Sequence, residues 1–513
     1  MRHKRGVDRS QSALLPPSVE DFVGPAHLVR VIDAFVARQD MVGLGFDKSR
    51  PAATGRPPYA PDDLLRLYIY GYWQRIRSSR ALERECQRNL EVMYLVRQLA
   101  FDHKTIANFR KDNAAAIEAV CAQFVQFVRG AGVLEGSEAV VAIDGSKFKA
   151  SAAQGSVVDE ASAAARRQRL SERIGQYLEQ MDALDAREQV ASEASAEQLQ
   201  AALLRLLEQD HALAQAQTVI AEQAQAQAQA QAPTEPEAAD AHTPESHTPE
   251  PRAPEAIPVK PQVGLTDVDA VNLRHGQVGY NVQAAVEAHS KLIVAHEVTR
   301  QANDHRALAP TAQAAQAALP GQRLTVVADT GYMNGEQAQR CEQSGITPVV
   351  PMQRVAHNSA QADLYPKSAF VYEAASDTYR CPAGALLERY RRSRTEQVDH
   401  YRTAACGSCG HKGQCTASAQ RTIARSWFAA AAQRADERAR SDPSWMRLRA
   451  CTVEHRFGLL KALMPGGFLV RGLQKVRGEM ALAVLTVNLR RVMNMWGAEK
   501  LMQMLSAPVP ARA

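Results

Sequence analysis

The chain has 513 residues, a formal net charge of +6 and an ordinary hydrophobic fraction of 45%. This length exceeds a single core, so we expect about three units of roughly 100–200 residues each. The sequence has no apolar run of about 18 residues, and no apolar stretch follows its basic N-terminus, which argues against a membrane span and a secretory signal. We therefore expect a cytoplasmic protein. The positive charge is compatible with a nucleic-acid partner but is weak evidence alone.

Residues 1–133 predict an irregular segment followed by a helical unit. Residues 1–60 are rich in Pro and Gly, and Pro61 then opens a helix with acidic residues in its first turn. Two further helical patterns follow at 81–99 and 114–130, and the polar segment DHKTIANFRKDN lies between them. This order is typical of a helix-turn-helix-like DNA-binding unit at 61–133, although an ordinary helical bundle with a basic face fits at least as well. The residues that would meet DNA are Lys104, Thr105, Asn108, Arg110 and Lys111.

Two short apolar runs, VVAIDG and LTVVADTGY, each predict a buried strand followed by a carboxylate. The carboxylates are Asp144 and Asp329, and a glycine follows each of them closely. Glycine lets the backbone turn sharply and leaves room for a phosphate, and ligands of open α/β sheets gather where strands end. Each aspartate taken alone is more often a turn residue.

A helix is predicted between Asp442 and Pro465. Asp442 is a candidate N-cap, Pro443 would take the first helical position, and Pro465-Gly466-Gly467 is a stop. Its apolar stripe comprises Val453, Phe457, Leu460 and Met464.

Glu454 lies on another face of this helix, which it shares with Arg447 and Lys461 at intervals of seven residues. A glutamate between two cations is usually part of a solvated face. Together with the two strand-end aspartates, however, it would complete a set of oxygen ligands for a hard divalent cation, and such cations act on phosphates.

The chain between the two strands changes composition. Residues 161–232 are mainly Ala, Gln, Glu, Leu and Arg with helical apolar spacing, which predicts a helical hairpin or coiled coil. Residues 233–263 are rich in Pro and predict a disordered linker. Residues 264–355 read as a β-hairpin followed by alternating helices and strands, which predicts a mixed α/β sheet continuing the part begun at 134–160.

Four of the eight cysteines cluster with the spacing Cys-x24-Cys-x2-Cys-x5-Cys inside an insertion at 356–440. Four soft ligands with a Cys-x2-Cys pair fit a structural Zn²⁺ site, and the alternative is a loop of reduced cysteines. Arginines between the two halves would make the insertion a basic flap near DNA. The cysteines are Cys381, Cys406, Cys409 and Cys415.

The sequence resembles the DDE transposases encoded by bacterial insertion sequences. The segments that carry the resemblance are GRPPYAPDDLLRLYIYGYWQRIRSSRALE, HKTIANFRKDN, LTDVDAVNLRHGQVGYNVQAAVEAHSKLIVAHEVT, ADTGY, the cysteine cluster and VEHRFGLLKALMPGGFLVRGLQKVRGEMALAVLTVNLRRV. The resemblance omits the helical insertion and the Pro-rich linker. It implies an RNase H-like α/β catalytic domain with a mixed sheet, preceded by an all-α DNA-binding domain and closed by C-terminal helices at 441–500.

The resemblance also implies residue roles. Asp144, Asp329 and Glu454 would hold two divalent ions, normally Mg²⁺ or else Mn²⁺. Related transposases carry a Tyr-x-x-Arg-x-x-x-Glu-x-x-x-x-x-x-Lys signature, whose Glu and Lys correspond to Glu454 and Lys461. The Tyr and Arg positions hold Arg447 and Ala450 instead, and Arg449 would supply the charge one residue early.

The implied activity is metal-dependent cleavage and strand transfer of DNA at terminal inverted repeats, by a homodimer or a larger assembly. Lys147, Arg447 and Arg449 would contact DNA near the acids. Without metal, mutual repulsion should raise the pKa values of the three acids, and Mg²⁺ should stabilise the fold. The alternatives are an inactive or domesticated RNase H-like DNA-binding protein or nuclease and, more distantly, a coiled-coil scaffold in which the acids are structural.

Overall fold

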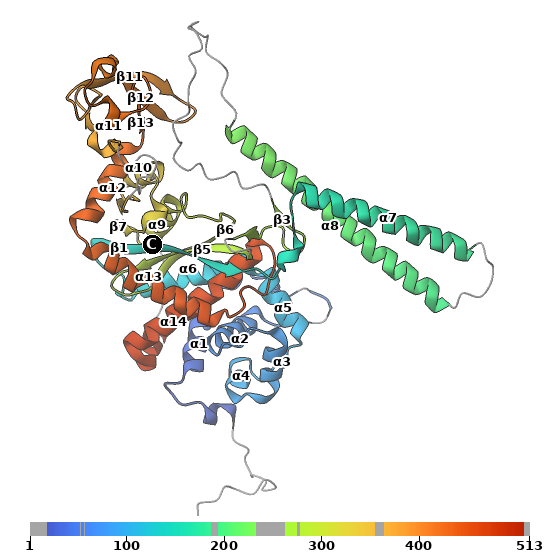
Figure 1. The fold of residues 1–513 in the computed structure, drawn as a ribbon. Helices are drawn as coiled ribbons and strands as arrows, with labels where there is room; N and C mark the ends of the chain where they lie inside the picture. Colours follow the sequence, from blue (N-terminus) through green and yellow to red (C-terminus); the bar gives the residue numbers. More distant parts are fainter. Residues whose placement is uncertain are drawn as a thin grey trace, which may run out of the picture.

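The computed structural model describes residues 18–51, 53–55, 57–185, 193–231, 262–273, 277–353 and 364–506. Figure 1 shows a central sheet wrapped by helices, with the N-terminal helices beneath it, a small β subdomain beyond its other side and a long helical hairpin that projects away. The predicted linker at 233–263 lies outside the described residues except for its last two positions.

The N-terminal unit is helical, and its helices begin earlier than the sequence predicts. Residues 1–60 are not wholly irregular, because α1 forms within them and buries Ile32 and Phe35 in the core. The helical pattern at 81–99 is broken at Asn89, whose side chain accepts hydrogen bonds from the first amides of the next helix. The elements are η1 (Val19–Phe22), α1 (Leu28–Ala37), α2 (Pro61–Trp73), α3 (Ser79–Arg88), α4 (Leu90–Leu95), α5 (His103–Asp112) and α6 (Ala114–Gly130).

Among the described residues, six strands form the central mixed sheet, in the order β4-β5-β1-β7-β8 with β6 paired to β5. β5 runs antiparallel to β1 and β6, whereas β7 is parallel to β1 and β8 is parallel to β7. The predicted hairpin and the alternation of helices and strands are therefore confirmed. The strands are β1 (Glu138–Lys149), β4 (Val271–Asn272), β5 (Val278–Glu287), β6 (Ile293–Thr299), β7 (Arg323–Val327) and β8 (Thr347–Val349).

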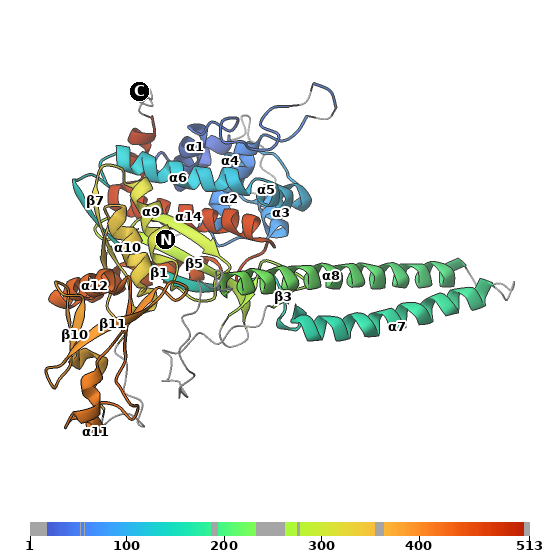
Figure 2. The ribbon, with the colours of Figure 1, turned by 90° about the horizontal axis from the view of Figure 1, so that it is seen from above.

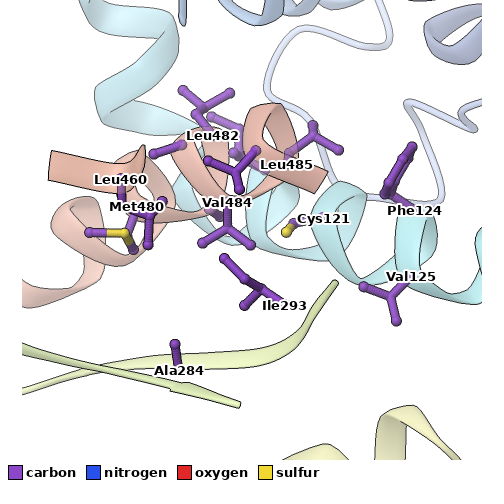
Figure 3. Packing of buried hydrophobic residues seen from close by; sticks show 14 of the residues in the cluster. Cys121, Phe124, Val125, Ala284, Ile293, Leu460, Met480, Leu482, Val484 and Leu485 are labelled. Atoms are coloured by element: carbon purple, nitrogen blue, oxygen red, sulfur yellow. The ribbon is translucent and has the colours of Figure 1, made fainter. Parts of the chain in front are cut away.

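Helices cover both faces of this sheet. In Figure 1, α9 (Leu308–Ala318) and α10 (Gly335–Gln343) lie above it, and α6, α13 (Ser444–Leu463) and α14 (Leu473–Ser506) lie below. Figure 3 shows α6 and α14 packed together on one side of β5 and β6, with apolar side chains filling the layer between helices and strands. α14 is kinked at Gly497, which has a φ of 77°. Within the part of the chain that the structure describes, no helix is long and apolar enough to cross a membrane.

The region predicted as a hairpin or coiled coil forms a helical hairpin, seen side-on in Figures 1 and 2. Its helices pack through a small apolar cluster that includes Leu170, Leu213 and Ile220, and an Arg167–Asp210 ion pair of 2.8 Å joins them. The elements are η2 (Gln154–Ser156), β2 (Val157–Val158), α7 (Glu160–Asp185), α8 (Glu193–Gln231) and β3 (Val263–Gly264), and β2 pairs with β3 at the base.

The cysteine-rich insertion contains an antiparallel sheet that the sequence did not predict, with the strand order β13-β12-β11-β10-β9. Its core is built from aromatic and aliphatic residues such as Tyr379, Leu387 and Tyr401. The elements are η6 (Lys367–Ala369), β9 (Val371–Glu373), β10 (Thr378–Arg380), β11 (Leu386–Ser393), β12 (Val398–Arg402), η7 (Ala404–Ser408), α11 (Lys412–Cys415), β13 (Ile423–Ser426) and then α12 (Ala429–Ser441), which returns to the central domain.

Candidate active site

The sheet register places Asp144 and Asp329 beside each other. The parallel ladder between β1 and β7 ends at the pair Ala142–Val327, and each aspartate lies two residues beyond that pair. Asp329 follows its strand as predicted and caps η4 (Thr330–Tyr332) by accepting a hydrogen bond from the Gly331 amide at 2.9 Å.

The prediction that Asp144 also follows its strand is wrong. β1 continues to Lys149, because its other edge remains paired with β5, where Asp144 stands opposite Ala284. Both aspartates therefore lie just past the end of the parallel ladder between β1 and β7, although only Asp329 lies past the end of its own strand.

Helix α13 brings the third acid and a cation to this point. The Arg449 guanidinium contacts Asp144 Oδ2 at 2.9 Å, Asp329 Oδ2 at 3.2 Å and Glu454 Oε1 at 3.4 Å. The Arg449 side chain is only 13% exposed, and its Nε is buried without a hydrogen-bond partner among the described residues. One arginine thus links all three predicted acids.

The boundaries and faces of α13 largely follow the sequence. The helix begins at Ser444, one residue later than predicted, and Asp442 accepts a hydrogen bond from the Ser444 amide at 2.8 Å. The helix ends at Leu463, just before the Pro-Gly-Gly sequence, as predicted. Gly467 has a φ of 85°, and a Cβ there would collide with the Lys149 carbonyl. The predicted apolar stripe is buried in full, at Val453, Phe457, Leu460 and Met464.

Burial raises the pKa of Asp144 above its usual value, and the neighbouring Asp329 adds to this, while Arg449 and the Gly145 amide oppose it. The predicted increase is confirmed for Asp144. Its main physical cause is loss of hydration rather than repulsion among the acids.

The three acids form a donor set that suits a divalent cation, because carboxylate oxygens are the ligands such ions prefer. Among the described residues, however, no group of three or more His, Cys, Asp or Glu side chains is arranged so that it could hold a metal ion. In this arrangement the Arg449 guanidinium is the cation that the carboxylates share.

A polar network supports the acid site from the other face of the sheet. The Asp304 carboxylate accepts hydrogen bonds from Gln283 Nε2 and Asn281 Nδ2, each at 2.7 Å, and the Tyr332 hydroxyl donates to Gln283. A Cβ at Gly145 would lie 2.5 Å from Asp304 Oδ1 and 2.6 Å from Gln283 Nε2. A side chain at position 145 would therefore have to displace Asp304 and Gln283 from this network.

The sequence analysis missed this network. Burial, followed by the charges of Asp304, Asp144 and Asp329, raises the pKa of the Tyr332 hydroxyl, so the network and the acid site influence each other electrostatically. One pattern pointed to it: Asn281 and Gln283 are polar amides two residues apart in a mainly apolar strand, and the structure buries both fully. Buried amides at such spacing must find partners on the same face of a sheet.

The other cations predicted near the acids lie at different depths. Arg447 and Lys461 are exposed on α13. Lys147 is half-buried, and its Nζ lies 3.5 Å from Asp304. Arg447 and Lys461 are thus accessible on the surface, and Lys147 borders the network under Gly145.

Of the residues predicted to meet DNA in the N-terminal unit, all but Arg110 lie at or near the surface. Lys104 and Asn108 line an open groove between the starts of α3 and α5, together with Ser78, Ser79 and Arg80. Lys111 is exposed, and the Thr105 hydroxyl donates to Asp102 at 2.6 Å.

The prediction for Arg110 is wrong, because its side chain points into the interior. Arg110 is 5% exposed and lies 3.5 Å from Glu479 of α14. It joins the N-terminal helices to α14 instead of facing solvent.

The four clustered cysteines line one cavity in the insertion, together with His411. Burial raises the pKa of the Cys415 thiol, and the other three cysteines act in the same direction while Arg421 opposes them. The fold therefore gathers the cysteines, although not in a metal-ligating arrangement among the described residues.

A mixed sheet in this strand order, flanked by helices and preceded by a helical unit, is the architecture of RNase H-like catalytic domains, which perform phosphoryl transfer. Two family models match the chain: the Transposase domain (DUF772) over residues 17–112 and the Transposase DDE domain over residues 264–489. Comparison with curated proteins and with solved structures gave no match. The chain belongs to the DDE transposases, a family of phosphoryl-transfer enzymes that bind DNA and use a divalent metal. Asp329 and Glu454 fall inside the second match, whereas Asp144 lies between the two.

Proposed function

We propose that this chain is an active transposase that binds the terminal inverted repeats of its own element, cuts DNA strands there and joins the freed ends to target DNA. The observation that carries the proposal is the meeting of Asp144, Asp329 and Glu454 around one arginine, from two adjacent strands and a helix. The raised pKa of Asp144 adds to it, because perturbed carboxyls gather at functional sites. The enzyme would act in the bacterial cytoplasm, on the nucleoid, as a homodimer or larger assembly.

The three acids would hold Mg²⁺ or Mn²⁺, which when bound supplies an activated water and stabilises the leaving 3′-oxygen. Arg449 offsets the repulsion among the three carboxylates, to each of which it is paired. Its guanidinium lies beside the acids, where it can contact the phosphate that is cut. Lys461, two turns beyond Glu454 on the same face, would contact the strand outside the acids.

DNA recognition is assigned to the groove lined by Lys104 and Asn108, with Arg80 at its edge. The groove is open, and its lining offers cations and amide groups suited to phosphates and base edges. Lys111, Lys147 and Arg447 would add contacts to the backbone.

Strand cleavage tests the proposal. Wild-type protein with Mg²⁺ or Mn²⁺ should nick a labelled duplex that carries an end of the element, and Asp144→Asn should reduce nicking by at least about 1,000-fold while still binding the duplex. The matched control is Glu138→Gln, an exposed acid on the same strand, which should cut normally. Nicking by Asp144→Asn at the wild-type rate would refute the site. A wild-type protein that binds but never nicks would favour the inactive DNA-binding alternative.

We also propose a structural Zn²⁺ held by Cys381, Cys406, Cys409 and Cys415, since all four line one cavity. Four cysteine sulfurs are the donor set of closed zinc sites, and a bound ion would draw them together from their present positions. Freshly purified protein should contain about one zinc per chain by metal analysis, and Cys409→Ser should lose it. Zinc-free protein with an unchanged melting temperature after chelation would exclude the site.

A further inference from the structure

Arg456 of α13 is a buried arginine without a partner. It is 7% exposed, its Nε has no hydrogen-bond acceptor, and among the described residues no ion pair or hydrogen bond engages its side chain. Burial, together with the nearby Arg491, lowers the pKa of Arg456 to about 10. A buried charge is stable only where a partner or a ligand compensates it.

The other deeply buried arginines of the described chain are compensated. Arg66 contacts three aspartates, the shortest at 2.5 Å, and Arg77 contacts Glu479 at 2.7 Å. Arg110 shares that glutamate. Arg456 therefore departs from a pattern that the rest of the fold follows.

Two more cations converge on the same place, the turn between β5 and β6. Lys291 Nζ donates to Thr452 Oγ1 at 2.7 Å, and Thr452 lies one helical turn before Arg456 on α13. Arg491 Nε donates to the Ser290 carbonyl at 2.7 Å. Lys291 and Arg491 are half-buried, so this cation cluster of Lys291, Arg456 and Arg491 borders solvent.

Glu287, the buried acid at the end of β5, does not neutralise the cluster. Both oxygens of Glu287 accept backbone amides of the turn, from His289 at 2.8 Å and from Ser290 at 2.6 Å. No ion pair within the described ranges links Glu287 to any of the three cations. Within the described residues, no ion pair therefore balances the charge of Lys291, Arg456 and Arg491.

We propose that the cluster of Lys291, Arg456 and Arg491 binds a phosphate of the DNA backbone. Arg456 lies seven residues after Arg449, so the two arginines share one face of α13 about 10 Å apart. A strand whose scissile phosphate meets the acids would therefore carry another phosphate a few nucleotides away within reach of the cluster. The choice of DNA as occupant rests on the proposed transposase function, while the anion site itself does not.

The test uses the full chain and two readouts. In the first, inorganic phosphate should raise the melting temperature of the wild type by a few degrees above KCl of equal ionic strength. Arg456→Met, which keeps volume but removes charge, should lose at least half of this increase without melting earlier in KCl. Arg323→Met, which removes an 81%-exposed arginine at the far end of β7, should respond like the wild type.

In the second readout, anisotropy of a labelled duplex is followed against KCl concentration. Arg456→Met should bind about three- to tenfold more weakly and lower the slope of log K against log salt by about 0.9, the value of one phosphate contact. Arg456→Lys should retain the slope. An unchanged phosphate response and salt slope in Arg456→Met would overturn the proposal in favour of a structural role. If that variant does not fold, Lys291→Met, at a half-buried member of the cluster, takes its place, and an unchanged phosphate response there would overturn the proposal. A normal phosphate response without any DNA cleavage would refute the proposed function and leave the anion site standing.

Discussion

Two clusters of carboxylates and arginines lie on either side of the catalytic domain, and their balance of charge is opposite. Where the N-terminal helices meet α14, the carboxylate of Glu479 is fully buried. It accepts hydrogen bonds from Tyr72 Oη at 3.0 Å, from Arg77 Nη2 at 2.7 Å and from two backbone amides. At the acid site, three carboxylates share one arginine, and Glu454 remains 62% exposed on its side chain.

The difference distinguishes a structural cluster from a reactive one. Glu479 has more donors than it needs, so its charge is satisfied by the protein and fixes the N-terminal helices onto α14. The acid site has three carboxylates against one arginine, an excess of negative charge that agrees with the proposed metal-holding role. Satisfied polar groups hold a fold together, whereas unbalanced ones indicate where a ligand belongs.

The largest effect is expected at the satisfied cluster. Glu479→Gln would leave Arg77 and Arg110 buried without a counter-ion and would turn an amide N–H toward donors. We expect a loss of about 3–5 kcal/mol in the free energy of unfolding, measured by urea denaturation.

The control for this variant is Glu297→Gln, at a half-exposed pair with Arg477 whose atoms are 3.6 Å apart. Glu297→Gln should lower the free energy of unfolding by less than about 1 kcal/mol. If the two variants are equally stable, Glu479 is not the structural centre that its contacts indicate.

The sequence predicted those parts of the fold and site that depend on the periodicity of apolar residues along one helix or strand. The face of α13 that carries Glu454 follows from helical spacing, and Asp329 follows from an apolar run that ends just before it. For Asp144 the apolar run predicted the strand but not its end, because β1 stays paired with β5 as far as Lys149. The mixed sheet and the helical hairpin were predicted for the same reason. Arg449 was identified only as a displaced charge, because its contacts to three acids depend on distances that the sequence does not contain.

Residues whose roles depend on distant partners could not be predicted. From the sequence, Arg110 is expected to be an exposed cation on a polar helix. Its burial depends on Glu479, which lies several hundred residues later in the chain. Asp304 stands in a polar loop and acquires its role from Gln283 and the missing side chain of Gly145. The sheet of the cysteine-rich insertion was missed because charged residues occupy half of β11, so that strand shows no apolar alternation.

The smaller effect is expected at the unbalanced cluster, where Arg449→Gln removes the shared cation. Metal-free protein should melt slightly earlier, because the acids lose their counter-charge. Mn²⁺ should then stabilise the variant more than the wild type, since the ion no longer competes with a guanidinium for the same oxygens. A tenfold gain in affinity would add about 1.4 kcal/mol at saturating metal.

Arg447→Gln is the matched control, because it removes the same charge from an exposed position on the same helix. It should leave the Mn²⁺ response at the wild-type value. Melting temperatures of the wild type and both variants are measured across a Mn²⁺ titration in constant KCl. They show whether the response depends on a positive charge anywhere on α13 or on the contact of Arg449 with the acids. An Arg449→Gln protein that responds no more strongly than Arg447→Gln would mean that the arginine and the ion do not share a site, and the acids would then form a structural cluster like that of Glu479.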